Sequence, residues 1–131
     1  MPIADREHHL YQFAIIRADL EMEAGKLSAQ AGHAYTYSLF KAYEYEPQRV
    51  IDYRNKEKGG SKVTLKAKNL NQLLKAYEQL QDEGIICALI VDQHHILPPH
   101  FTGEPIITAI GIGPVKQSEV RHITKKFQCV K

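Results

Sequence analysis

The sequence predicts a single-domain α/β fold in three layers (α/β/α), with helices on both faces of a small mixed, mostly parallel sheet of about four strands. Short apolar runs of strand length alternate along the 131 residues with longer segments whose apolar residues recur every three or four positions. This alternation is typical of an α/β layer structure. A chain of this length has room for one domain of ordinary size, which we expect to span residues 1–131.

Four segments are expected to be strands. Residues 12–18 (QFAIIRA) and 86–91 (ICALIV) are short and apolar, as buried strands are. Residues 61–67 (SKVTLKA) alternate polar and apolar side chains, which predicts a half-exposed strand. Residues 106–112 form the fourth strand, and a turn is expected at residues 113–114.

Four further segments are expected to be helices. The first ends before Pro47, because proline cannot continue a helix. The third begins after Asn69, a favoured N-cap residue, and ends at Gly84, a favoured C-cap residue. Residues 92–105 are left as a loop rich in histidine and proline. The expected helices cover residues 26–45, 48–55, 69–84 and 117–127.

Composition excludes several classes of protein. Cys87 and Cys129 are too few for a disulfide scaffold or a cysteine-rich zinc site. The apolar runs fall far short of the roughly 20 residues of a membrane helix, and the polar first residues do not resemble a secretory signal. GxSxG, GxxxxGK[ST] and GxGxxG motifs are absent, which disfavours α/β-hydrolases, P-loop enzymes and dinucleotide enzymes. We therefore expect a cytoplasmic protein that has no membrane partner.

The charge is nearly balanced overall but unevenly distributed. Seventeen basic side chains against fifteen acidic ones give a net charge of +2, yet residues 54–75 carry seven basic side chains and one acidic one. Such a basic segment suits a polyanion such as nucleic acid, although composition alone favours a solvated lysine-rich surface. With no Trp and only four Phe, contact with phosphates is a better expectation than base stacking.

Two loops mark the expected binding site, because ligands of α/β folds bind beyond the carboxyl ends of parallel strands. In the first loop, Lys26 opens a helix, where the positive end of the helix dipole disfavours a cation unless an anion is also present. Gln30 and His33 follow on the same helix face. Equally consistent with the sequence is an ordinary surface lysine followed by a packed histidine.

The second loop starts at Asp92, at the end of an aliphatic strand. This carboxylate is either a general base or a cap at the strand end, and for an isolated aspartate the cap is the commoner role. Adjacent histidines such as His94 and His95 do not easily share one tetrahedral metal ion, so no metal or organic cofactor is expected. Thr108 taken alone is an ordinary strand residue.

Taken in order, these segments resemble the type 2 peptidyl-tRNA hydrolases, the archaeal and eukaryotic class. Residues 17–34 (RADLEMEAGKLSAQAGHA) are similar to that family's DLxMxxGKxAAQxxHA motif. Residues 62–66 resemble its KVVLK strand, residues 69–84 its LxxLxxxAxxxG helix, and residues 88–92 its ALIxD strand end. Residues 108–114 resemble its last strand, so the likeness covers most of the chain.

The resemblance implies hydrolysis of the ester between a peptide and the 3′ end of tRNA, by a compact domain that is often dimeric. It makes Asp92 the base for a water molecule, and Lys26 the group that stabilises the oxyanion or holds a phosphate. Gln30 and Thr108 would orient water or carbonyl, and His33 would assist or support the nearby loop. The residues expected to contact the tRNA substrate are Lys56, Lys58, Lys62, Lys66, Lys68, His94 and His95.

One segment departs from the family pattern. After Asp92 the family usually continues as AGxT, whereas this chain reads Gln93, His94, His95 and Ile96, and a longer loop precedes Thr108. Two alternatives therefore stay open. Besides peptidyl-tRNA hydrolysis, the chain could be a non-catalytic RNA- or protein-binding module on the same scaffold, or a hydrolase for a different acylated substrate.

Overall fold

The computed structural model describes residues 8–56, 60–93 and 96–131. The helical elements are η1 (Ala18–Leu20, a 3₁₀ turn), α2 (Ala24–Tyr45), α3 (Pro47–Lys56), α4 (Leu70–Asp82) and α5 (Gln117–Thr124). The strands are β1 (Leu10–Arg17), β2 (Ser61–Ala67), β3 (Cys87–Asp92), β4 (Ile96–Leu97), β5 (Phe101–Thr102), β6 (Ile106–Lys116) and β7 (Gln128–Cys129).

Five of the strands form one sheet in the order β3-β6-β1-β2-β7. β1 pairs in parallel with β2, and β6 runs antiparallel to both β1 and β3. The short β7 is antiparallel to β2. β1, β2 and β3 therefore run in the same direction and finish at one end of the sheet, which we call the carboxyl end.

The α/β fold class is confirmed, and all four predicted strands are present. A sheet of five strands is compatible with the expected number of about four. The expectation of mostly parallel strands is wrong, because three of the four pairings in this sheet are antiparallel. A parallel neighbour needs a crossover connection, usually a helix. The described part of the segment between β3 and β6 contains only the small β4–β5 hairpin, so β6 returns antiparallel beside β3.

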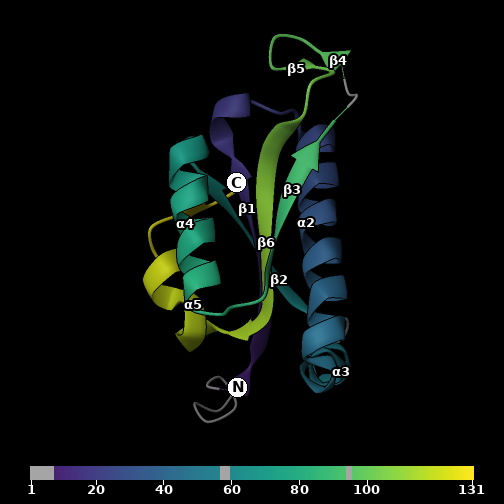
Figure 1. The fold of residues 1–131 in the computed structure, drawn as a ribbon, viewed down its shortest axis with the longest axis vertical. Coiled ribbons are helices and arrows are strands. Elements are labelled where there is room, and N and C mark those ends of the chain that lie inside the picture. Colours follow the sequence, from purple (N-terminus) through teal and green to yellow (C-terminus); the bar gives the residue numbers. More distant parts are fainter. Residues whose placement is uncertain (1–7, 57–59, 94–95) are drawn as a thin grey trace.

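The three predicted layers are visible in Figure 1, with α4 and α5 on one face of the sheet and α2 and α3 on the other. α2 packs across β6, β3 and β1, while α4 packs on the same three strands from the opposite face. The β4–β5 hairpin lies beyond the carboxyl end, next to the start of α2.

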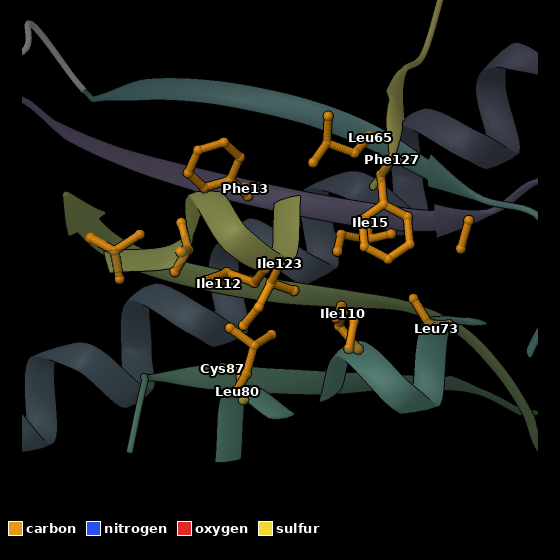
Figure 2. Packing of buried hydrophobic residues seen from close by; sticks show 14 residues of the cluster. Phe13, Ile15, Leu65, Leu73, Leu80, Cys87, Ile110, Ile112, Ile123 and Phe127 are labelled. Carbon is orange, nitrogen blue, oxygen red and sulfur yellow. The ribbon is translucent and has the colours of Figure 1, made fainter. Parts of the chain in front are cut away.

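Each face of the sheet packs against its own buried apolar cluster. Phe13 and Ile15 of β1 belong to the larger cluster, between the sheet, α4 and α5, which Figure 2 shows. Ala14 and Ile16, the alternate residues, face α2. Leu73 and Leu80 of α4 are fully buried in the larger cluster, and burying a leucine side chain contributes about 1.5–3 kcal/mol.

Small residues bring α2 unusually close to the sheet. Ala31 and Ala34 of the helix face Ala14 and Ala109 of the strands. A Cβ atom at Gly111 would overlap the carbonyl oxygen of Ala34, so this strand position has no room for a side chain. The sequence pattern of small residues in α2 therefore fixes how the helix lies on the sheet.

The ends of the elements are partly as predicted. Asn69 caps α4, since its side chain accepts a hydrogen bond of 2.9 Å from the backbone N–H of Gln72. The predicted turn at residues 113–114 is wrong, because β6 continues through Gly113 to Lys116. Gly113 adopts a φ of 90°, and its N–H donates to the carbonyl of Ile86 at 2.9 Å. The turn-forming residues are thus accommodated inside a strand.

Candidate active site

An ion pair joins the start of α2 to the end of β3. The Lys26 ammonium donates to Oδ2 of Asp92 at 2.5 Å, and the two side chains are only 14% and 16% exposed. Lys26 lies in the first turn of α2, whose N-cap residue, Glu23, makes no side-chain capping bond. The cation that is unfavourable next to the helix dipole is therefore balanced by a carboxylate from another element.

The topology brings these two residues together. Asp92 is the last residue of β3, and α2 starts just after β1, whose carboxyl end lies at the same end of the sheet. The antiparallel β6 begins there as well, with Ile106 opposite Asp92. The antiparallel direction of β6, which was not predicted from the sequence, thus brings Thr108, near the start of β6, to the site.

A β-bulge turns Thr108 toward α2. The β3–β6 register passes from Ile90 opposite Ala109 to Val91 opposite Ile107, so Thr108 is an extra residue on β6. Strict alternation would place Ala109 and Thr108 on opposite faces, but Ala109 packs in the α2 cluster and Thr108 hydrogen-bonds to an α2 side chain. Bulges commonly redirect a side chain next to active sites.

Gln30 and Thr108 form a buried polar pair behind the ion pair. The Thr108 hydroxyl donates to Oε1 of Gln30 at 2.6 Å, and the two residues are 0% and 3% exposed, respectively. Because Oε1 accepts this bond, the amide nitrogen is the group left to donate toward a ligand. Gln30 lies one turn beyond Lys26 on the same helix face.

A cavity of about 310 Å³ opens beside this group, between α2 and β3. His33 lines it from α2, and its ring centre lies 6.4 Å from that of Tyr37. Within the described residues the His33 ring makes no hydrogen bond to the ion pair. The residues lining the cavity are Gln30, His33, Tyr37, Leu89, Ile90, Val91 and Asp92.

The segment that departs from the family pattern covers the ion pair on another side. Phe101, in the β4–β5 hairpin, is buried, and its ring centre lies 4.6 Å from the Lys26 ammonium. A cation over an aromatic face is a stabilising arrangement. This contact was not predictable from the sequence, since a lone phenylalanine in a loop has no periodic pattern. His94 and His95 lie outside the described residues.

The predicted tRNA-binding lysines divide into two places. Lys66 and Lys68 line a cavity of about 510 Å³ just beyond the carboxyl ends of β1 and β2. Lys126, which was not among the predicted site residues, lines the same cavity. The only sequence signal for it is that residues 116–131 carry five Lys and Arg side chains and one acidic side chain. Lys66 also borders a smaller cavity of about 160 Å³ that includes Leu27, next to Lys26 in the chain.

Lys62 lies nearer the other end of β2. Its ammonium donates to the Gly60 carbonyl at 3.2 Å and lies 5.4 Å from the ring centre of Tyr53. Lys66 follows four positions later along the strand, about 13 Å away. Lys58 and the side chain of Lys56 lie outside the described residues.

An acid–base pair lies at the rim of the larger cavity. The Arg17 guanidinium donates to both oxygens of Asp19, at 3.1 and 2.7 Å, and also to the Ile107 carbonyl. These hydrogen bonds from Arg17 lower the pKa of Asp19 below its ordinary value.

Among the described residues, no group of three His, Cys, Asp or Glu side chains is arranged to hold a metal ion. No described helix is both long enough and apolar enough to cross a membrane.

Comparison with known proteins identifies the family. The family model described as "Peptidyl-tRNA hydrolase PTH2" matches residues 10–130. The chain belongs to this family. The resemblance stated from the sequence motifs is thereby confirmed, and the residues of the ion pair and the buried polar pair all fall inside the matched range.

Several archaeal relatives named peptidyl-tRNA hydrolase match nearly end to end. The Methanococcus vannielii protein is 34% identical over 119 residues, which cover 89% of this chain and 96% of the relative. The Methanothermobacter thermautotrophicus protein is 35% identical over 113 residues, covering 86% and 93%. The Methanocaldococcus jannaschii protein is 33% identical over 110 residues, covering 84% and 90%.

Proposed function

We propose that this chain hydrolyses the ester bond of peptidyl-tRNA, releasing the peptide and free tRNA, as one domain spanning residues 1–131. Membership of the peptidyl-tRNA hydrolase family supports the reaction class. The observation that carries the proposal is the Lys26–Asp92 ion pair at the mouth of a cavity, because it combines a carboxylate with a cation beside space for a substrate.

In the proposed mechanism Asp92 is the general base. Its Oδ2 is held by Lys26, which leaves Oδ1 to accept a proton from a water molecule. The water oxygen attacks the ester carbonyl carbon, and the carbonyl oxygen becomes an oxyanion. When the intermediate collapses, the bond from carbon to the ribose oxygen breaks and that oxygen takes the proton. General-base assistance typically accelerates such a step about 10²–10⁴-fold.

Lys26 and Gln30 are proposed to stabilise the oxyanion. The ammonium and the free N–H groups at the start of α2 concentrate positive charge beside Asp92. The Gln30 amide, oriented by its bond with Thr108, supplies a further donor on the cavity side. His33 either relays the leaving-group proton or holds the substrate, and the pH profile of His33→Gln distinguishes these roles. The proposed steps use no metal or organic cofactor.

The tRNA is proposed to lie across the carboxyl end of the sheet. Lys66, Lys68 and Lys126 surround one cavity there, and the smaller cavity at Lys66 leads toward the start of α2. Contacts to phosphates from lysines position a nucleic acid without reading its sequence. Lys62 and the predicted contacts at Lys56, Lys58, His94 and His95 stay part of the proposal.

We further propose that the protein acts in the cytoplasm, in translation, as a homodimer. Phe40, Tyr43, Tyr45 and Ile51, on α2 and α3, are 61%, 60%, 68% and 42% exposed, and such apolar groups often mark an interface. Sedimentation should give twice the chain mass for the wild type, and the monomer mass for a Phe40→Glu variant. A monomeric wild type would contradict the dimer without affecting the proposed reaction.

The test of the reaction is release of an N-acetylated amino acid from its tRNA ester by the purified chain. Hydrolysis with turnover is expected. Binding of deacylated tRNA without any turnover would instead identify a non-catalytic RNA-binding module. Turnover of another acylated compound, with peptidyl-tRNA left intact, would identify a hydrolase for a different substrate.

A further inference from the structure

One side of β3 is open along the cavity. β3 is the outermost strand of the sheet and, within the described residues, pairs with β6 alone. The carbonyl of Ile86 accepts a hydrogen bond from the N–H of Gly113 in β6, and backbone groups alternate in direction along a strand. Ala88 and Ile90 therefore bond toward β6, whereas the N–H and C=O groups of Cys87 and Leu89 face away from it.

Lys41 supports this assignment and closes one end of the open side. Its ammonium donates to the Cys87 carbonyl at 3.0 Å, which requires that carbonyl to point away from β6. Nothing in the described part of the chain occupies the outward N–H and C=O of Leu89. Exposed strand edges of this kind readily accept another strand.

The open side leads directly to Asp92. Leu89, Ile90 and Val91 line the cavity from β3, and Asp92 ends both the strand and the cavity wall. Val91 is 41% exposed, and Tyr37, across the cavity on α2, is 55% exposed. An extended peptide would find main-chain hydrogen bonds on β3 and apolar contacts on both walls.

We infer that the peptide portion of the substrate binds as an additional strand along the open side of β3, parallel to it. This inference rests on the proposed function, which places the ester carbonyl of the C-terminal residue at Asp92. Followed from the ester toward its N-terminus, the peptide passes Leu89. The peptide and β3 therefore run from N-terminus to C-terminus in the same direction. At about 3.3 Å per residue, the stretch from Leu89 to Asp92 holds about three peptide residues.

A series of synthetic substrates tests the inference on the wild-type enzyme. The parent is N-acetyl-trialanyl-tRNA, and the variants carry a single N-methyl group on the second or the third residue from the ester. Only alternate residues of an added strand point their N–H groups at β3. One of the two N-methyl groups should therefore lower kcat/KM about tenfold, and the other should change it by less than about twofold.

Other outcomes have distinct meanings. If both N-methylated substrates are cleaved within about twofold of the parent, or both lose activity equally, the added strand is excluded while the hydrolase remains. If neither the parent nor N-acetyl-alanyl-tRNA is cleaved, the proposed function itself fails. The single-residue ester lacks the neighbouring amides, so it reports on the reaction independently of the strand.

A pair of protein variants provides a second test. Leu89→Pro removes the outward N–H, which is tolerated at a strand edge, and Leu89→Ala removes the side chain but keeps that N–H. Relative to Leu89→Ala, Leu89→Pro should lower the ratio of kcat/KM for the trialanyl ester to kcat/KM for the single-residue ester about fivefold. Equal losses on both substrates would count against the inference, and circular dichroism would verify folding. If Leu89→Pro does not fold, the N-methyl series decides.

Discussion

Two groups of polar side chains in the α2–sheet interface differ in charge, and the contrast between them separates structure from chemistry. Away from the carboxyl end, Gln12 donates to the Tyr35 carbonyl at 2.7 Å and the Tyr53 hydroxyl donates to the Ser61 carbonyl at 2.8 Å. Gln12 carries no charge, and burial raises the pKa of the Tyr35 hydroxyl, which favours its neutral form. At the carboxyl end the corresponding group includes a charged pair, Lys26 and Asp92, beside a cavity.

The difference shows what a polar residue in this interface can do. Neutral groups whose hydrogen bonds are satisfied among themselves stabilise the packing of α2 and α3 on the sheet. A partly buried ion pair is a poor source of stability, because desolvating the charges offsets their attraction. We therefore expect substitutions at the carboxyl end to change catalysis, and substitutions at the neutral group to change stability.

The largest effect is expected from Asp92→Asn. Loss of the proposed base should lower kcat about 10²–10⁴-fold while the fold is kept, because asparagine has nearly the same shape. Single-turnover release of N-acetyl-alanine from its tRNA ester measures this rate. Asp82→Asn, on the exposed end of α4, is the matched control and should behave as the wild type. An Asp92→Asn enzyme of wild-type rate would refute the assignment of the base.

Lys26→Met should have the next largest effect. It keeps the aliphatic stem but removes the ammonium, so kcat should fall about 10²–10³-fold, as when an oxyanion-stabilising group is lost. Lys41→Met, which removes an ammonium that bonds the far end of β3, is the control. If both methionine variants kept full kcat on the single-residue ester, Lys26 would have no role in the chemical step.

A pair of hydroxyl deletions compares the two groups directly. Thr108→Val leaves buried Gln30 without its partner, which should cost about 1–3 kcal/mol of unfolding free energy and also reduce kcat. Tyr53→Phe should cost about 1 kcal/mol and leave kcat unchanged. Urea denaturation and turnover measured on the same samples separate the effects. A fall in kcat for Tyr53→Phe alone would reverse the assignment of the two groups.

A smaller effect is expected at the cavity of about 510 Å³ that Lys66, Lys68 and Lys126 line. Lys126→Ala should weaken tRNA binding modestly and reduce the slope of log affinity against log salt by about 1. Fluorescence titration of labelled deacylated tRNA at several salt concentrations measures both quantities. Lys75→Ala, an exposed lysine outside the cavity, should have no comparable influence. Identical slopes for wild type and Lys126→Ala would remove Lys126 from the binding surface.

The smallest effect concerns Asp19 at the rim of that cavity. Its pKa in the folded chain lies below the ordinary 3.8, chiefly because Arg17 donates hydrogen bonds to it. The stabilisation is therefore complete above pH 3.8 and is lost as the pH falls through the lower folded value. Asp19→Asn should reduce thermal stability slightly at neutral pH, by less than about 1 kcal/mol, and this difference should shrink as the pH is lowered below 3.8. A difference that stays constant as the pH is lowered would contradict this explanation.

The sequence predicted the parts of the fold that depend on local pattern. The strand at residues 61–67 was predicted to the residue, because its alternation reflects one buried and one exposed face. Strand direction was missed, since it is set by the connection between β3 and β6, whose hairpin consists of two-residue strands. β7 was missed because a strand of two residues shows no periodic pattern in the sequence.

For the candidate site, the sequence could place residues on elements and on a helix face, but it could not predict every contact between elements. Lys26 and Asp92 were expected at the same end of the sheet from the rule for parallel strands, and they lie in contact there. Their catalytic roles stay predictions. The contact of Thr108 with Gln30 depends on a bulge, and that of Phe101 with Lys26 depends on a hairpin, neither of which is encoded in residue spacing.

The missing side chain at Gly111 sets the position of a residue well away from it. Even one methyl group there would push against the backbone of Ala34 and lift α2 from the strands. Ala34 lies eight residues beyond Lys26, about 12 Å along a stiff helix, so such a displacement would be transmitted to the ammonium. The absence of a side chain at Gly111 thus helps to set the distance between the Lys26 ammonium and the Asp92 carboxylate.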